Sequence, residues 1–206
     1  MWEPPNLYAL LVMDPTLIDF PASFDTDRLT IRAPRFGDGA QIAQAARESL
    51  NDLRPWMAWA RDEPNVEDSE ARVRQRMADW IARKELLLLG FLRNTDTLVL
   101  SSGLHRIDWD ARSFETGYWV RAKYAGQGFV TEAVNGITRF AFEHLEANRV
   151  QIRCDAENVR SIAVAKRCGF LLEGRLRHDD LGVGGDLRDT LVFSKISPDE
   201  FHRYDQ

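Results

Sequence analysis

The spacing of hydrophobic side chains along the chain predicts helices and strands that alternate only in part. The helical pattern is clearest between Thr131 and Leu145, where apolar residues recur three and four positions apart. Helices are predicted over the ranges 37–50, 66–82, 131–145 and 158–168. Strands are predicted over 28–33, 86–92, 97–107, 114–120, 150–154, 170–177 and 188–196. Because helices separate only some of the strands, this order predicts a mixed sheet of the α/β (α+β) class.

Two turns in this order bear on the fold and on a binding site. The glycine-rich turn at 182–185 lies between the last two strands, which we therefore expect to pair antiparallel. Three large side chains follow a turn at Pro55 and belong either to the core or to the wall of a substrate groove; they are Trp56, Met57 and Trp59.

Length and composition fit one folded domain. The chain has 206 residues, of which 44% are hydrophobic and 29% charged, and no break in composition divides it. We expect an N-terminal arm over residues 1–24 and a single domain over 25–206. The apolar run Tyr8 to Met13 is too short to span a bilayer and has no basic leader. These features predict a cytoplasmic protein without a membrane partner.

Charge is distributed unevenly along the chain. The net charge of −5 argues against a general nucleic-acid binder. The segment from Gly117 to His178 nevertheless carries ten basic and six acidic residues, a balance of +4, so that the remainder is −9. One explanation is that these charged residues simply lie on solvent-exposed faces. The other is that the basic segment binds an anionic cofactor and the acidic remainder binds a cationic substrate.

The cysteines and histidines do not predict a metal site or a covalent mechanism. Cys154 and Cys168 are the two cysteines, and neither lies in a pattern of spaced metal ligands. Nothing near either thiol in the sequence would stabilise a thiolate, so we expect both to be small, buried side chains.

A glycine-containing turn between a predicted strand and a predicted helix is the strongest chemical signal in the sequence. Gly126 and Gly128 lie between the strand ending at Val120 and the helix beginning near Thr131. Such a turn lets backbone N–H groups approach an anion, and the following helix directs its unpaired donors to the same point. We therefore expect a phosphate or pyrophosphate here. The spacing fits neither the Walker loop nor the dinucleotide fingerprint, because Thr131 stands where the latter has its third glycine.

The same turn resembles the acetyl-CoA loop of the GNAT superfamily of N-acetyltransferases, with Lys123 to Gly128 in its place and Lys123 departing from the usual first residue. The segment Asp155 to Asp180 resembles the branch that acetylates N-terminal Ser or Ala of ribosomal proteins. The residues at matching spacing are Asn158, Ser161, Gly169, Phe170, Glu173 and Gly174. The segments 27–34 and 53–60 are also similar to that branch. The likeness runs from about residue 25 to 195 and is weakest over 61–97.

The resemblance implies a fold and a cosubstrate. The implied fold is a single GNAT-type domain with a twisted, mostly antiparallel sheet of six to seven strands flanked by helices. Its fourth and fifth strands would splay apart to admit the pantetheine arm of acetyl-CoA. Backbone donors of the fourth strand, which include Trp119 and Val120, would stabilise the oxyanion. Asn158 and Ser161 would bind the pantetheine, and the pyrophosphate would lie on the loop Ala125, Gly126, Gln127, Gly128, Phe129 and Val130.

The resemblance also implies catalytic roles without a metal. The tyrosine that often serves as general acid in GNAT enzymes is replaced here by Ala165. The ribosomal branch instead implies Ser161 as proton donor to the leaving thiolate, and a general base at the position of Asp180. Glu115 is the second candidate base and His178 the third. Asn158 and Ser161 also suit a helix cap, and Glu115 or Asp180 could be a structural or a solvated acid.

The cost of deprotonation favours an α-amine as acceptor. Taking the pKa of an α-amine as about 8 and of lysine as about 10.4, deprotonation at pH 7 costs about 1.4 and about 4.6 kcal/mol. The first hypothesis is direct acetyl transfer to the N-terminal amine of a peptide or protein, such as a ribosomal protein. The alternatives are a small-molecule amine as acceptor and, in another class, a weakly catalytic sensor or scaffold that binds acyl-CoA. A homodimer is left open.

Overall fold

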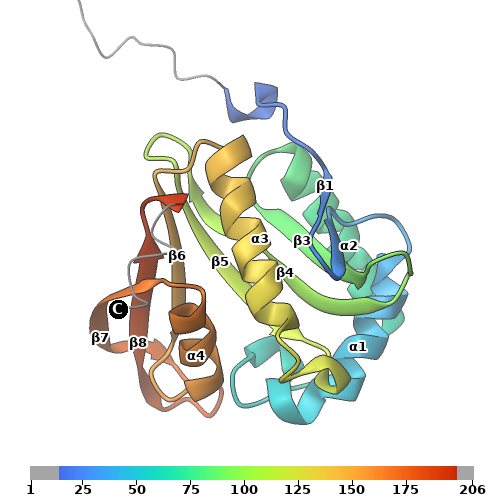
Figure 1. Cartoon of the computed structure of the whole chain (residues 1–206). Helices are drawn as coiled ribbons and strands as arrows, with labels where there is room; N and C mark the ends of the chain where they lie inside the picture. Colours follow the sequence, from blue (N-terminus) through green and yellow to red (C-terminus); the bar gives the residue numbers. More distant parts are fainter. Residues whose placement is uncertain (1–13, 199–206) are drawn as a thin grey trace, which may run out of the picture.

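The computed structural model describes residues 14–198, and within them an eight-stranded sheet carries four α-helices. The strands run in the order β1-β2-β3-β4-β5-β6-β8-β7 (Figure 1). Their bounds are β1 Ser23–Asp25, β2 Leu29–Arg32, β3 Leu86–Leu92, β4 Leu98–Asp108, β5 Ser113–Val120, β6 Arg149–Asp155, β7 Leu171–Leu181 and β8 Leu187–Lys195. The helices are α1 Asp38–Leu53, α2 Val66–Ile81, α3 Phe129–His144 and α4 Val159–Arg167.

The helices cover the sheet from both sides. Helix α3 crosses one face with α4 beside it, and α1 and α2 lie behind the sheet in Figure 1. The larger core lies under α3, where the apolar face that includes Val134, Ile137 and Phe140 packs on strands β2 to β6 and β8. A smaller cluster joins Ala45 of α1 to Leu89, Phe91 and Leu98. The apolar face of each helix therefore explains its position.

The strands β5 and β6 form the only parallel pair between the described strands, and they soon part. Their register joins Ser113 to Arg149, Phe114 to Val150 and Glu115 to Gln151. Beyond that point β5 continues to Val120 and β6 to Asp155 without pairing with each other, although β5 still pairs with β4 and β6 with β8. These are the fourth and fifth predicted strands, so the expected splay is confirmed.

The mixed, mostly antiparallel fold is confirmed, with one strand more than expected. The additional strand is β1, whose three residues pair with β2 at the start of the domain. A three-residue strand is too short to carry a hydrophobic period, which explains why the pattern did not predict it. Phe20, which precedes β1, packs edge-on against Phe140, and the ring of Phe24 within β1 stacks on the same side chain at 5.1 Å. The apolar run Tyr8 to Met13 lies outside the described residues.

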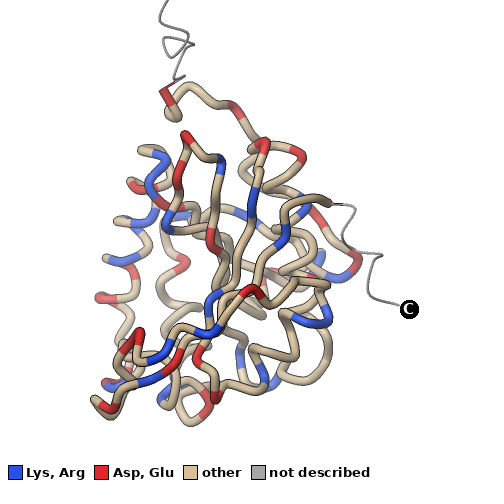
Figure 2. Tube along the Cα trace, turned by 90° about the vertical axis from the view of Figure 1, so that its left-hand side faces the viewer, with Lys and Arg blue, Asp and Glu red and all other residues tan. Residues whose placement is uncertain are grey.

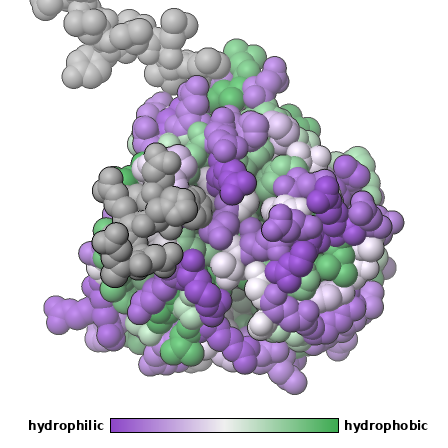
Figure 3. All heavy atoms as spheres, viewed as in Figure 1, coloured by the Kyte–Doolittle hydropathy of each residue, from purple (hydrophilic) through white to green (hydrophobic). Residues whose placement is uncertain are grey.

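The surface is mixed in charge. Acidic and basic positions are interspersed along the trace when the molecule is viewed from the β7–β8 side (Figure 2). On the face seen in Figure 3, hydrophilic side chains predominate and hydrophobic ones show in small separate areas. Between residues 14 and 198, no helix has the length and apolar character needed to cross a bilayer.

Candidate active site

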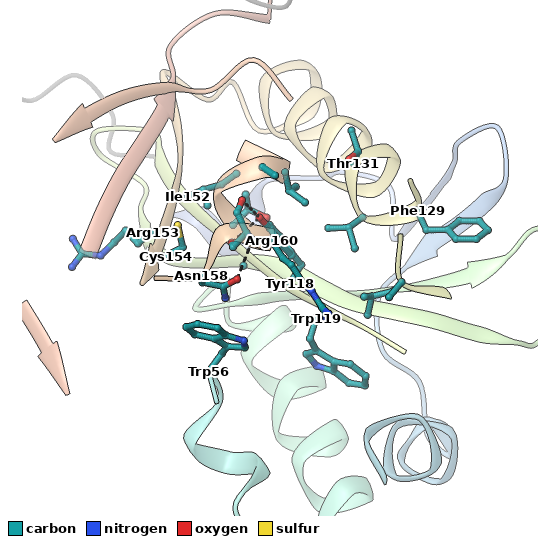
Figure 4. Close-up of a pocket in the computed structure, with 18 of the residues that line it drawn as sticks. Trp56, Tyr118, Trp119, Phe129, Thr131, Ile152, Arg153, Cys154, Asn158 and Arg160 are labelled. Atoms are coloured by element: carbon teal, nitrogen blue, oxygen red, sulfur yellow. Dashed lines mark hydrogen bonds between the residues drawn. The ribbon is translucent and has the colours of Figure 1, made fainter. Parts of the chain in front are cut away.

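A groove of about 1740 Å³ opens where β5 and β6 separate. One end is lined by the loop before α3 and by the first turns of α3 and α4. The other end is lined by residues 52, 53 and 55–58 and by the turn between β7 and β8. We call these the cofactor end and the acceptor end. The close-up in Figure 4 looks into the region where they meet.

The cofactor end is formed by a turn that ends in the N-cap of α3. Gly126 and Gly128 have φ angles of +74° and +81°, a left-handed region in which a side chain is strained. Gly128 is the N-cap, and the first helical bond runs from Glu132 N–H to the Gly128 carbonyl at 3.0 Å. The N–H groups of residues 128–131 precede that bond and have no acceptor within the helix. The predicted anion-binding geometry is present.

Arg28, which sequence reasoning missed, supports this turn. Its Nη1 donates to the Gln127 carbonyl at 3.0 Å, and its guanidinium lies 4.1 Å from the centre of the Phe129 ring. Its Nε contacts Glu132 of α3 at 2.6 Å, and the same carboxylate accepts from the hydroxyl of Thr26 at 2.6 Å. Residues 26–28 therefore tie the start of the domain to the start of α3. The segment 27–34 carried only a family likeness in the sequence.

The register of β5 decides which backbone donors face the splay. Arg121 N–H donates to Val99 of β4, and Trp119 lies opposite Ser101. Hydrogen-bonded pairs alternate along an antiparallel ladder, so Trp119 N–H also points to β4. The backbone groups of Tyr118 and Val120 point the other way, into the splay. Of the two predicted residues, Val120 therefore directs its N–H into the groove, and Trp119 lines the groove by other atoms.

The start of α4 brings three polar groups together. Asn158 is the N-cap, and its Oδ1 accepts from Ser161 N–H at 3.1 Å. The Tyr118 hydroxyl, which sequence reasoning also missed, lies 3.0 Å from Ser161 Oγ and 3.2 Å from the Ser161 carbonyl oxygen. Burial raises the pKa of Tyr118 above its ordinary value. Ala165, which replaces the usual GNAT tyrosine, is fully buried in the core.

The two cysteines are free thiols, as expected from their number and context. Cys168 is buried, and burial raises its pKa to about 12. Cys154 is only partly buried and lines the groove, so the expectation of a buried side chain is wrong for this residue. Burial still raises its pKa, because its effect outweighs that of a hydrogen bond with Ser161. Neither thiol has the lowered pKa of a nucleophile.

Glu115 is held by several partners at the point where the strands part. Its side chain is only 8% exposed, and its carboxylate lies 3.1 Å from both His105 Nε2 and Gln151 Nε2 and 3.5 Å from Arg106. Burial alone would raise the pKa of Glu115, but His105, Arg106 and Gln151 together hold that pKa below its ordinary value. A carboxylate in this state is a weak proton acceptor.

Asp180 is different, because it lies on the exposed strand β7 and lines the acceptor end. Its Oδ1 accepts from Leu181 N–H at 2.8 Å, and no ion pair is found for it among residues 14–198. The third candidate base, His178, does not line the groove, and its N–H donates to Asp189.

The acceptor end has an aromatic wall and two contacts across its mouth. Trp56 and Met57 line the groove, so of the two predicted alternatives they belong to the groove wall and not to the core. Trp59 packs on Trp119, with ring centres 5.8 Å apart. Arg160 of α4 contacts Asp52 at the end of α1 at 2.8 Å. Arg61 donates to the Val183 carbonyl in the β7–β8 turn.

The groove suits a nucleotide thioester. Unpaired main-chain donors at the start of α3 fit a pyrophosphate, and the gap between the ends of β5 and β6, which do not pair with each other, fits an extended amide-containing arm. Asn135 lines the same groove, and its Oδ1 is buried without a hydrogen-bond partner in the described chain. Among residues 14–198 no group of three or more His, Cys, Asp or Glu side chains is placed to hold a metal ion. A splayed mixed sheet with such a loop defines an acyltransferase that uses acetyl-CoA.

Comparison with known proteins agrees with this class. A family model described as an acetyltransferase (GNAT) domain matches residues 28–171, and the chain belongs to that family of acetyl-CoA-dependent N-acetyltransferases. A Bacillus subtilis (strain 168) protein named "Putative ribosomal N-acetyltransferase YdaF" is 31% identical over 173 residues, which cover 82% of this chain and 92% of that protein. The ribosomal-protein-serine acetyltransferase of Escherichia coli (strain K12) is 29% identical over 101 residues, 49% of this chain and 56% of that protein.

A solved structure gives the same result for the fold. The microcin C7 self immunity acetyltransferase MccE, in complex with acetyl-CoA and AMP, superposes with a TM-score of 0.79 at 27% identity. The match covers 86% of this chain and 98% of that chain.

Proposed function

We propose that this N-acetyltransferase acetylates the N-terminal α-amine of a protein or peptide, of which a ribosomal protein is one candidate. The observation that carries the proposal is the contrast between the two candidate bases that line the groove, Asp180 and Glu115. Asp180 is exposed at the acceptor end and free of a cationic partner in the described chain, whereas Glu115 is enclosed by His105, Arg106 and Gln151. A single exposed carboxylate suits an amine that loses its proton at small cost.

The chain's own residues divide the chemistry between them. Acetyl-CoA supplies an acetyl group activated as a thioester. The N–H groups of residues 126–130 would hold its pyrophosphate, and Asn158 would bind its pantetheine amides. Val120 N–H would donate to the acetyl oxygen as negative charge develops there; one such donor is typically worth roughly 3 kcal/mol.

Two side chains at opposite ends of the groove would carry out the proton transfers. Asp180 would accept the proton released by the attacking nitrogen, directly or through one water molecule, and pass it to solvent. Ser161 Oγ would give its proton to the departing sulfur and recover one from water in the open groove. One proton leaves and one is supplied, so the protein returns to its starting state after each turnover.

The names of two relatives support a protein as the acceptor. The Bacillus subtilis protein is named a putative ribosomal N-acetyltransferase, and the Escherichia coli protein a ribosomal-protein-serine acetyltransferase. A spermidine N(1)-acetyltransferase of Vibrio cholerae is more distant, at 24% identity over 165 residues. A polyamine is therefore the alternative that the experiment must include.

The test supplies acetyl-CoA with competing amines. Peptides beginning with Ser or Ala are compared with N-terminally blocked copies that contain an internal lysine, and with spermidine. Release of the CoA thiol gives the rate, and mass spectrometry of the product locates the acetyl group. We expect acetylation of the free N-terminus alone. Turnover only on lysine or spermidine would overturn the assignment, and tight CoA binding without turnover would favour a sensor.

A further inference from the structure

Two hydroxyl groups from different elements meet inside the groove, and only one of them has a role so far. Tyr118 comes from β5 and Ser161 from the first turn of α4, 43 positions later. Their oxygens are 3.0 Å apart, and either can be the donor. The question is which of the two hydroxyls donates to the other when an acceptor for the serine proton is present.

The geometry allows two arrangements of these protons. In one, the phenol donates to the Ser161 carbonyl at 3.2 Å and the serine hydroxyl donates to the phenol oxygen. In the other, the phenol donates to Ser161 Oγ, and the serine proton is free to point into the groove. The Ser161 carbonyl also lies four residues before Ala165 within α4, so it keeps its regular helical hydrogen bond in either arrangement.

We propose that Tyr118 is a positioning residue for Ser161, because its phenol donates to Ser161 Oγ and so directs the serine's own proton toward the space between β5 and β6. The proposal rests on the proposed role of Ser161 as proton donor. Tyr118 holds a proton throughout and does not transfer it. In this family the usual tyrosine would stand on α4, at the position that Ala165 occupies here. Tyr118 instead brings a hydroxyl group from β5.

The surroundings of Tyr118 favour a permanent donor. The phenol lies against the core under α3 and α4, and burial raises its pKa, so it stays protonated at neutral pH. Ser161 N–H is already fixed by Asn158 Oδ1, which leaves rotation of the serine hydroxyl as the remaining freedom. The Cys154 thiol also contacts the Ser161 side chain, and a hydrogen bond from Tyr118 to Oγ restricts the rotation further.

The test combines Tyr118→Phe, Ser161→Ala and the double variant. With a Ser-peptide, we expect Ser161→Ala to lower kcat about a hundredfold and Tyr118→Phe about tenfold, each with little change in the KM of acetyl-CoA. In the Ser161→Ala background, Tyr118→Phe should then change kcat less than about twofold, since residues that act as a unit are not additive. Ser161→Thr keeps the hydroxyl, so Tyr118→Phe should again cost about tenfold there.

A binding measurement provides a readout other than turnover. Calorimetric affinities for CoA and for desulfo-CoA, which lacks the sulfur, isolate the contact between Ser161 and the thiol. The ratio of the two affinities should fall in Ser161→Ala and also in Tyr118→Phe. Thr138→Val is the control, because it removes a buried hydroxyl of α3 that has no hydrogen-bond partner in the described chain. It should leave the ratio and kcat unchanged.

Two results would overturn the inference. If the kcat effects of Tyr118→Phe and Ser161→Ala multiply, or if Tyr118→Phe weakens CoA and desulfo-CoA equally, Tyr118 only anchors α4 to the sheet. If Ser161→Ala leaves kcat and the affinity ratio unchanged, the proposed acid falls and this inference with it. Absence of acetyl-CoA turnover in the wild-type protein would instead be a failure of the proposed function.

Discussion

The two ends of the groove are built from different kinds of groups. The cofactor end presents backbone N–H groups, held by two glycines with positive φ and by the first turn of α3. The acceptor end presents charged side chains from a loop and an edge hairpin, most of them in ion pairs. Main-chain donors depend on local backbone geometry, so they can be recognised from a short motif. Side-chain charges acquire their meaning only from partners that are distant in sequence.

The largest expected effect distinguishes the two candidate bases, Asp180 and Glu115. Asp180→Asn should lower kcat roughly a hundredfold at pH 7, because the carboxylate is the proposed proton acceptor, and should leave the free energy of unfolding nearly unchanged. Glu115→Gln should do the reverse, costing about 1–3 kcal/mol of stability through the loss of its charged hydrogen bonds. Steady-state kinetics and denaturant unfolding of both variants make the comparison.

The pH dependence of stability sharpens this contrast. The pKa of Glu115 is lowered in the folded protein, so its contribution to stability is present above the ordinary value of 4.5 and is lost as pH falls through the folded value. The difference in unfolding free energy between wild type and Glu115→Gln should therefore shrink below about pH 4.5. A hundredfold loss of kcat in Glu115→Gln, with Asp180→Asn still active, would exchange their roles.

A pair of N-cap glycines tests the cofactor end. Gly128→Val should weaken acetyl-CoA binding about tenfold or more, because the strained φ shifts the loop and a Cβ would lie 3.4 Å from Arg28 Nη2. Gly37, with a φ of +93°, caps α1 in the same conformation but does not line the groove. Gly37→Val should cost comparable stability and leave the affinity unchanged. Equal affinities in the two variants would remove the loop from the site.

Asn158 allows capping to be separated from cofactor binding. Asp caps a helix as well as Asn does, so Asn158→Asp should keep the stability that Asn158→Ala loses, about 1 kcal/mol. Both variants lack the side-chain amide donor and should raise the KM of acetyl-CoA about fivefold if that donor binds the pantetheine. A raised KM in the alanine variant alone would mean that Asn158 only caps α4.

The smallest expected effect concerns the support of the loop. Arg28→Ala should weaken acetyl-CoA binding about threefold, because the contacts of Arg28 with Gln127 and Glu132 position the loop without forming it. Arg93→Ala is a matched control, since Arg93 pairs loosely with Asp25 at 3.6 Å and does not line the groove. Calorimetry on both variants would contradict the account if their affinities were the same.

Local patterns in the sequence predicted most of the fold and the cofactor end. The bounds of β3 were predicted to the residue, and the splay followed from the family likeness carried by the loop and by Asn158 and Ser161. The short strand β1 was missed because three residues carry no period. Thr26, Arg28 and Tyr118 were missed for another reason. Their contacts with Glu132 and Ser161 join segments 43 to 106 positions apart, and no local spacing encodes them.

The acceptor end shows the same limit. Glu115 and Asp180 were both candidates by type and position, but a strand pattern does not reveal that Glu115 faces His105, Arg106 and Gln151 while Asp180 faces the groove. Likewise, the aromatic residues after Pro55 could line a core or a groove until the fold was known.

The most direct test of the central claim is a crystal structure of the protein with CoA. The account predicts the pyrophosphate on the N–H groups of residues 126–130 and the sulfur between the splayed ends of β5 and β6, within hydrogen-bond distance of Ser161 Oγ. It would be contradicted by a complex in which the pyrophosphate lies away from that loop or the sulfur lies outside the splay.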